Sequence, residues 1–130
     1  MSNAPTVLFG SVPLFRTVVR SATSDTATTV TPDDSGSLFV SLATATHTYT
    51  LPTVSNSAGK VFTFFAGDGT ATIVVTGGST DVMMGGDNAA ADTETETNHV
   101  VGDWGMIIGD GTYYYFLEGL AHSGAWTASG

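Results

Sequence analysis

Apolar and polar residues alternate along much of this chain with the period of two that is typical of half-buried β-strands. The clearest example lies in residues 46–76, where three strand-like segments are separated by turn-forming residues. In the first segment, 46–51, the side chains of His47, Tyr49 and Leu51 share one face and threonines occupy the other. The pattern predicts a strand that buries one face only.

The next two segments, 61–66 and 71–75, are rich in β-branched and aromatic residues. Gly67-Asp68-Gly69 between them predicts a tight hairpin, and the same turn sequence recurs as Gly109-Asp110-Gly111. Further strand-like segments cover residues 26–31, 37–42, 82–84, 100–101, 104–108 and 112–117. The chain is therefore predicted to be all-β, a compact antiparallel β-barrel or sandwich of about eight short strands.

Residues 1–24 are apolar but irregular, because Gly10, Pro13 and two arginines interrupt any regular period. Two alternatives follow: an edge strand packed on its own domain, or an extended N-terminal arm that docks on another subunit. Residues 25–130 are expected to form a single β-domain.

Residues 87–99 read DNAAADTETETNH and are polar and acidic, without apolar anchors. We expect an exposed loop with little regular structure, because nothing in it would repay the entropy lost on ordering.

Composition narrows the possible functions. The chain has 130 residues, of which 42 % are hydrophobic and only 12 % charged, with a formal net charge of −9. An acidic balance repels phosphate backbones and anionic lipid surfaces, which argues against nucleic-acid binding and membrane docking. Cysteine is absent, and the first ten residues lack the pattern of a secretory signal. Oligomerisation is the expected source of additional stability.

No motif carries a catalytic signature, so we expect a protein that is not an enzyme and needs no cofactor. The histidines His47, His99 and His122 do not have a metal-ligand spacing, and no GxSxG elbow is present. Calcium binding would need oxygen ligands, and five carboxylates gather near the acidic segment: Asp81, Asp87, Asp92, Glu94 and Glu96. They lack the EF-hand pattern, which favours a solvated loop.

Aromatic residues gather near the C-terminal end of the chain, at Tyr113–Tyr115, Trp104 and Trp126. They suit either a carbohydrate-binding face or a surface that is half core and half subunit interface.

Several short motifs resemble a module of tailed-bacteriophage structural proteins. They are Thr50-Leu51-Pro52, Ala58-Gly59-Lys60, Thr72–Val75, and a final hairpin that contains Gly102-Asp103 and Asp110–Tyr113. The resemblance covers about residues 46–117 and departs from the module at the acidic insertion 87–99.

The resemblance implies a capsid decoration (cement) protein, typically a homotrimer, that binds the major capsid protein on the virion exterior and bridges capsid subunits. The alternative is a tail-fibre or adhesin module that recognises host surface glycans.

The N-terminal segment supplies the hypothesis for capsid docking, because it concentrates both arginines of the chain among apolar residues. Arginine suits paired contacts with carboxylates, and apolar side chains would supply the buried part of the contact. The residues expected to dock are Phe9, Leu14, Phe15, Arg16 and Arg20.

Overall fold

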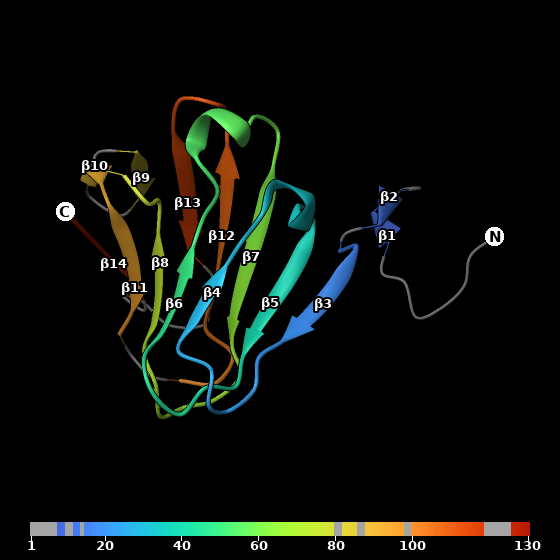
Figure 1. The fold of residues 1–130 in the computed structure, drawn as a ribbon, viewed down its shortest axis with the longest axis vertical. Coiled ribbons are helices and arrows are strands. Elements are labelled where there is room, and N and C mark those ends of the chain that lie inside the picture. The colour runs from blue at the N-terminus through green and yellow to red at the C-terminus, as the bar shows by residue number, and fades with distance from the viewer. Residues whose placement is uncertain are drawn as a thin grey trace.

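The chain folds as two β-sheets packed face to face, and neither sheet closes into a barrel (Figure 1). This computed structural model describes residues 8–9, 12–13, 15–79, 82–85, 88–97, 100–118 and 126–130. The prediction of a compact, all-β, sandwich-like fold is confirmed.

One sheet has seven strands and the other has five. The seven-stranded sheet runs in the order β10 (Asn88–Ala91), β9 (Met83–Gly85), β13 (Tyr114–Glu118), β12 (Trp104–Gly109), β7 (Val61–Ala66), β5 (Ser37–Ser41) and β3 (Thr17–Arg20). The five-stranded sheet runs in the order β14 (Trp126–Ser129), β11 (Thr93–Glu96), β8 (Ile73–Thr76), β6 (His47–Thr50) and β4 (Ala27–Thr29). Two short 3-10 helices, η1 (Pro32–Asp34) and η2 (Val54–Asn56), connect strands.

From β3 to β8 each successive strand lies in the opposite sheet from the one before it. Neighbours within a sheet in this part of the chain therefore run parallel, as in the pairs β3–β5, β5–β7, β4–β6 and β6–β8. The expectation of purely antiparallel pairing is wrong, because both sheets are mixed. The hairpins predicted within 46–76 are also wrong, since β7 lies across the sandwich from both β6 and β8.

Gly67 shows how the chain makes one of these crossings. Its amide donates a hydrogen bond to the carbonyl of Ser41 at 2.9 Å, at the end of β5. A Cβ at this position would lie 2.8 Å from side-chain carbons of both Val40 and Leu42. The first Gly-Asp-Gly sequence thus allows a close passage between sheets rather than a hairpin.

The second Gly-Asp-Gly sequence forms the predicted hairpin between the antiparallel strands β12 and β13. Asp110 accepts hydrogen bonds from the amides of Thr112 at 2.8 Å and Tyr113 at 2.7 Å. Gly111 takes a backbone φ of +93°, which residues other than glycine rarely adopt.

Aromatic rings from both sheets fill the centre of the sandwich. Tyr49 of β6 lies 5.6 Å from Phe39 of β5 and 5.0 Å from Phe64 of β7, measured between ring centroids. Each buried ring contributes about 1.5–3 kcal/mol of hydrophobic stabilisation. Tyr114 extends this core and donates its hydroxyl proton to the carbonyl of Pro52.

The acidic segment is not the exposed loop that its composition predicts. It contains β10 and β11, and β11 pairs on both sides, with β8 and β14. Glu94 and Glu96 point inward and are 1 % and 0 % exposed, while Thr93 and Thr95 point outward. The alternation TETET is therefore a real strand period, with carboxylates on the buried face.

The N-terminal segment contributes an edge strand to the body. Residues 17–20 form β3, which pairs parallel with β5 at the edge of the seven-stranded sheet. Ahead of it, β1 (Leu8–Phe9) and β2 (Val12–Pro13) pair with each other and lie beyond β3 (Figure 1).

Candidate functional site

The outer face of the seven-stranded sheet is apolar almost throughout. Strand register places the following side chains on that face: Val18, Arg20, Leu38, Val40, Val61, Thr63, Phe65, Met84, Trp104, Met106, Ile108, Tyr115 and Leu117. We call this surface the apolar face. Arg20 is the one charged residue among these outward positions.

The same sheet is apolar on its inner side, where Phe39, Phe62, Phe64 and Ile107 are buried in the core. Sheets that are apolar on both sides are normally covered on both sides. Among the described residues, Leu117 is still 51 % exposed and Val18 55 % exposed. The apolar face therefore has the composition of a buried surface but is partly open to solvent.

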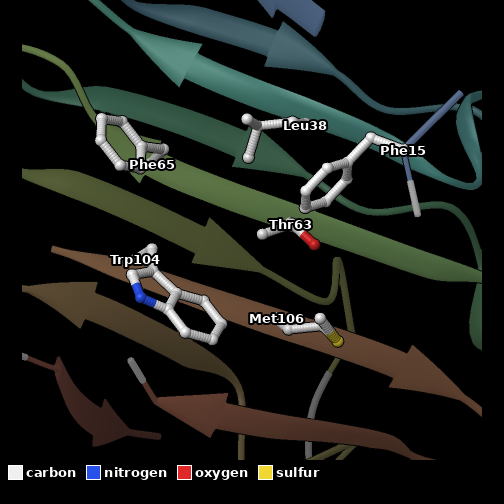
Figure 2. Close-up of a pocket in the computed structure, with 6 residues that line it drawn as sticks. All are labelled: Phe15, Leu38, Thr63, Phe65, Trp104 and Met106. Carbon is white, nitrogen blue, oxygen red and sulfur yellow. The ribbon is translucent and has the colours of Figure 1, made fainter. Parts of the chain in front are cut away.

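A groove of about 380 Å³ lies on the apolar face (Figure 2). Four neighbouring side chains of β7 and β12 form its floor: Thr63, Phe65, Trp104 and Met106. Leu38 of β5 and Phe15 from the segment before β3 complete the wall, and the ring of Phe15 lies near Leu38 in Figure 2. The lining side chains offer two polar groups, the Thr63 hydroxyl and the indole N–H of Trp104, and are otherwise apolar, so the groove suits an apolar side chain.

The structure places the five predicted docking residues in different environments. Phe15 lines the groove of its own sheet, and Arg20 ends β3 as an exposed residue on the apolar face. Arg16 donates hydrogen bonds to the carbonyls of Asp33 at 3.2 Å and Ser35 at 3.0 Å.

Arg16 therefore holds the turn around η1 in this structure, and its hydrogen bonds are made within the chain. Phe9 belongs to β1, and Leu14 lies outside the described residues. The sequence did not reveal the apolar face, because its residues come from strands that are distant along the chain.

The outer face of the five-stranded sheet is different, because it consists mainly of threonine. Strand register places Ala27, Thr29, Thr48, Thr50, Val74, Thr76, Thr93, Thr95, Thr127 and Ser129 there. We call this surface the threonine face. Two of its hydroxyl groups, Thr93 Oγ1 and Ser129 Oγ, bond to each other at 2.7 Å. The hydroxyl groups of the threonine face therefore need no partner protein to complete their hydrogen bonds.

The inner side of the same sheet carries a polar side chain, His47 of β6, which is fully buried. Its Nδ1 lies 3.0 Å from the Ser41 hydroxyl and its Nε2 lies 2.7 Å from the Thr28 hydroxyl. The ring also stacks on Tyr49, with centroids 4.2 Å apart. Burial lowers the pKa of His47, which favours the neutral imidazole, and each ring nitrogen has one hydroxyl partner.

The aromatic residues considered for sugar binding are divided between environments. Tyr114 and Trp126 are buried in the core, whereas Tyr115 and Trp104 lie on the apolar face. The Tyr115 hydroxyl donates to the Asp110 carboxylate at 2.6 Å.

Among the described residues, no group of three or more histidine, aspartate or glutamate side chains is placed to hold a metal ion. Of the residues considered for metal binding from the sequence, Asp81, Asp87, His99 and His122 lie outside the described part of the chain. No described helix is long and apolar enough to span a membrane.

Comparison with known proteins adds no relative: no family model, curated protein or solved structure matches this chain.

Proposed function

We propose that this protein is a homotrimeric capsid decoration protein of a tailed bacteriophage, and that its apolar face is the surface that joins the copies. The observation that carries the proposal is the apolar face itself, on a sheet that is apolar on both sides. The phage assignment rests on the motif resemblance in residues 46–117.

The size of the apolar face fits a subunit contact. Six strands at about 4.8 Å spacing and five residues at about 3.3 Å rise give an area on the order of 500 Å². This lies at the upper end of the apolar patches that stable monomers expose. It would also form a large part of one side of a standard protein interface, which buries about 800 Å² per partner.

Charge favours a second copy of the chain as the occupant. The protein has twelve acidic and three basic residues, so most approaches between two copies are repulsive. The apolar face has no acidic residue at its outward positions. The three copies of a trimer therefore meet with the least repulsion and the largest hydrophobic gain when their apolar faces are buried around a common axis.

The mechanism of such a protein is mechanical. Trimers would bind the major capsid protein on the outside of the head and bridge neighbouring capsid subunits, and the added contact area would resist internal pressure. Arg20 lies on β3 at the edge of the apolar face and is exposed, so it is free to bind a carboxylate of the capsid, whereas Arg16 bonds within its own chain.

Sedimentation of matched variants tests the subunit contact. Leu117→Asp places a carboxylate on the apolar face at a half-exposed position, where it should not disturb the core. Thr127→Asp places the same charge on the exposed threonine face and serves as the control. We expect wild type and Thr127→Asp to sediment as trimers at micromolar concentration, and Leu117→Asp as a monomer.

A monomeric wild type would refute the proposed contact. Equal trimerisation of all three proteins would place the interface elsewhere. Coating of undecorated heads by wild type, with hundreds of copies per particle, tests the decoration role itself.

A host-recognition role as a tail-fibre or adhesin module is the second candidate, and the observation that favours it is that Tyr115 and Trp104 share the apolar face. Sugar rings stack on such aromatic surfaces. Binding of wild type to host surface glycans, lost in Trp104→Ala, together with a handful of copies located on the tail, would favour this function over decoration.

A further inference from the structure

The carboxyl group of Glu94 lies in an unusual place for an acidic side chain. Glu94 belongs to β11 of the five-stranded sheet, points into the sandwich and is 1 % exposed. Its Oε1 atom has no hydrogen-bond partner among the described residues. An ionised carboxylate in such a position loses its hydration without compensation.

The side chain reaches the opposite sheet. A Cβ on Gly85 of β9 would lie 2.1 Å from Glu94 Oε1 and 2.9 Å from the Cβ of Phe116 in β13. Glycine at position 85 therefore leaves the space that the carboxyl group occupies. Glu94 thus joins β11 to the β9–β13 end of the seven-stranded sheet.

Among the described residues, no lysine or arginine is placed to neutralise this group. The chain has three lysine and arginine residues, of which Arg16 and Arg20 are at the β3 edge and Lys60 precedes β7. Strands β8, β14 and β9 present no titratable side chain to it.

In the part of the chain that the structure describes, the titratable groups around Glu94 are themselves acidic. They are Glu118 of β13 and, two residues along its own strand, Glu96. Tyr114 of β13 directs its hydroxyl away, to Pro52 and Ser57. Burial first, and then the negative charge of Glu118, raise the pKa of Glu94 to about 7.

We propose that Glu94 is a proton-controlled latch between the two sheets. Protonated, its carboxyl group stays in the interior and β11 remains closed against β9 and β13. Ionised, the group gains by reaching water, and this end of the sandwich opens more often. The latch is independent of the trimer contact, since Glu94 faces the interior and the apolar face lies outside.

The sign of the pH effect follows from linkage. The folded protein binds the Glu94 proton up to about pH 7, whereas the unfolded chain releases it near the ordinary value of 4.5. Stability from this group is therefore complete below about pH 4.5 and is lost as the pH rises through 7.

Urea unfolding of wild type and Glu94→Gln between pH 5 and 8 tests the latch. Glutamine keeps the shape of a protonated glutamate but cannot ionise. We expect the unfolding equilibrium constant of wild type, relative to Glu94→Gln, to increase on the order of 50-fold over this range. The ratio cancels the titration of groups that do not interact with Glu94, such as His47. Parallel pH profiles for the two proteins would overturn the proposal.

Glu118→Gln provides the matched control, because it removes the acidic neighbour and leaves Glu94 in place. Its pH-dependent loss of stability should remain but be centred at a lower pH than in wild type. A pH profile of stability identical to that of wild type would show that Glu118 does not contribute to the latch.

A measurement on wild type alone covers the case in which Glu94→Gln does not fold. Carboxyl ¹³C NMR should show Glu94 titrating near pH 7, with faster amide exchange in β11 than in β7 over the same range. Titration of Glu94 with its ordinary pKa of 4.5 would overturn the proposal. Amide exchange in β11 that does not change as Glu94 ionises would also overturn it.

Discussion

The two sheets of this sandwich distribute polarity in opposite ways. The seven-stranded sheet is apolar on both sides, with Phe64 turned into the core and the adjacent Phe65 turned outward. The five-stranded sheet has hydroxyl groups outside and titratable groups inside, where His47 and Glu94 are buried. The seven-stranded sheet therefore lacks a polar outer face, whereas the five-stranded sheet has a polar outer face and also buried titratable groups.

The difference separates two kinds of stability. Threonine suits a solvated strand surface, so the five-stranded sheet needs no outside contact but must keep its interior groups neutral. The interior of the seven-stranded sheet is mainly apolar, and this sheet gains free energy when its outer face is covered. Association should therefore depend on the seven-stranded sheet, and pH dependence on the five-stranded sheet.

The largest effect is expected from removing β11 from the five-stranded sheet. Replacing Ala89–Glu96 by a glycine-serine linker of equal length would leave β8 and β14 without their shared neighbour. We expect the cooperative unfolding transition to be lost in thermal circular dichroism. The same replacement at the exposed residues 44–46 should preserve the transition. A melting temperature close to wild type for the β11 replacement would show that this segment is dispensable.

The second effect compares the two sides of β7 in the seven-stranded sheet. Phe64→Ala should lower the free energy of unfolding by about 3–5 kcal/mol at any protein concentration, because it leaves a cavity in the core. Phe65→Ala should cost about 1 kcal/mol in the monomer. It should cost more at concentrations where wild type is trimeric, because binding stabilises the folded state. Denaturation at two protein concentrations distinguishes the two positions, and an equal, concentration-independent loss for both would contradict the comparison.

The third effect concerns His47 on the acidic side of neutrality. Burial lowers its pKa below 6.5 in the folded state, so the unfolded chain takes up the proton first as the pH falls. Stability from this group is complete above about pH 6.5 and is lost below it, opposite in sign to Glu94.

His47→Gln cannot titrate and should lose less stability than wild type between pH 6.5 and 5. At pH 7 its free energy of unfolding should be lower than that of wild type by about 1–3 kcal/mol, because glutamine cannot hydrogen-bond to both the Ser41 and the Thr28 hydroxyl. Urea unfolding at three pH values measures both effects, and a variant with the wild-type pH profile would exclude His47 as the group that responds.

The smallest effect separates the two Gly-Asp-Gly turns. Asp110 accepts from two amides and from the Tyr115 hydroxyl, whereas Asp68 accepts from the amide and hydroxyl of Thr70. Asp110→Ala should therefore lower the melting temperature more than Asp68→Ala. The reverse order would show that the crossing between sheets depends more on its turn than the hairpin does.

Local pattern was sufficient for the central strands of this fold, but not for β10, β11 and β14. Alternation placed strands at 37–42, 46–51, 61–66, 104–108 and 112–117, and the structure has strands in each. Turn chemistry placed the β12–β13 hairpin correctly, because glycine and aspartate at 109–111 satisfy that turn from within. These features depend on neighbours along the chain.

Which strands pair was decided by tertiary structure. The same Gly-Asp-Gly sequence makes a hairpin at 109–111 and a crossing between sheets at 67–69, because packing of both inner faces, not the turn, selects the partner strand. The apolar face likewise exists only once β5, β7, β12 and β13 lie side by side. Glu94 shows the limit most directly: composition predicts an exposed loop, but pairing on both sides of β11 fixes the period and turns the carboxyl group inward.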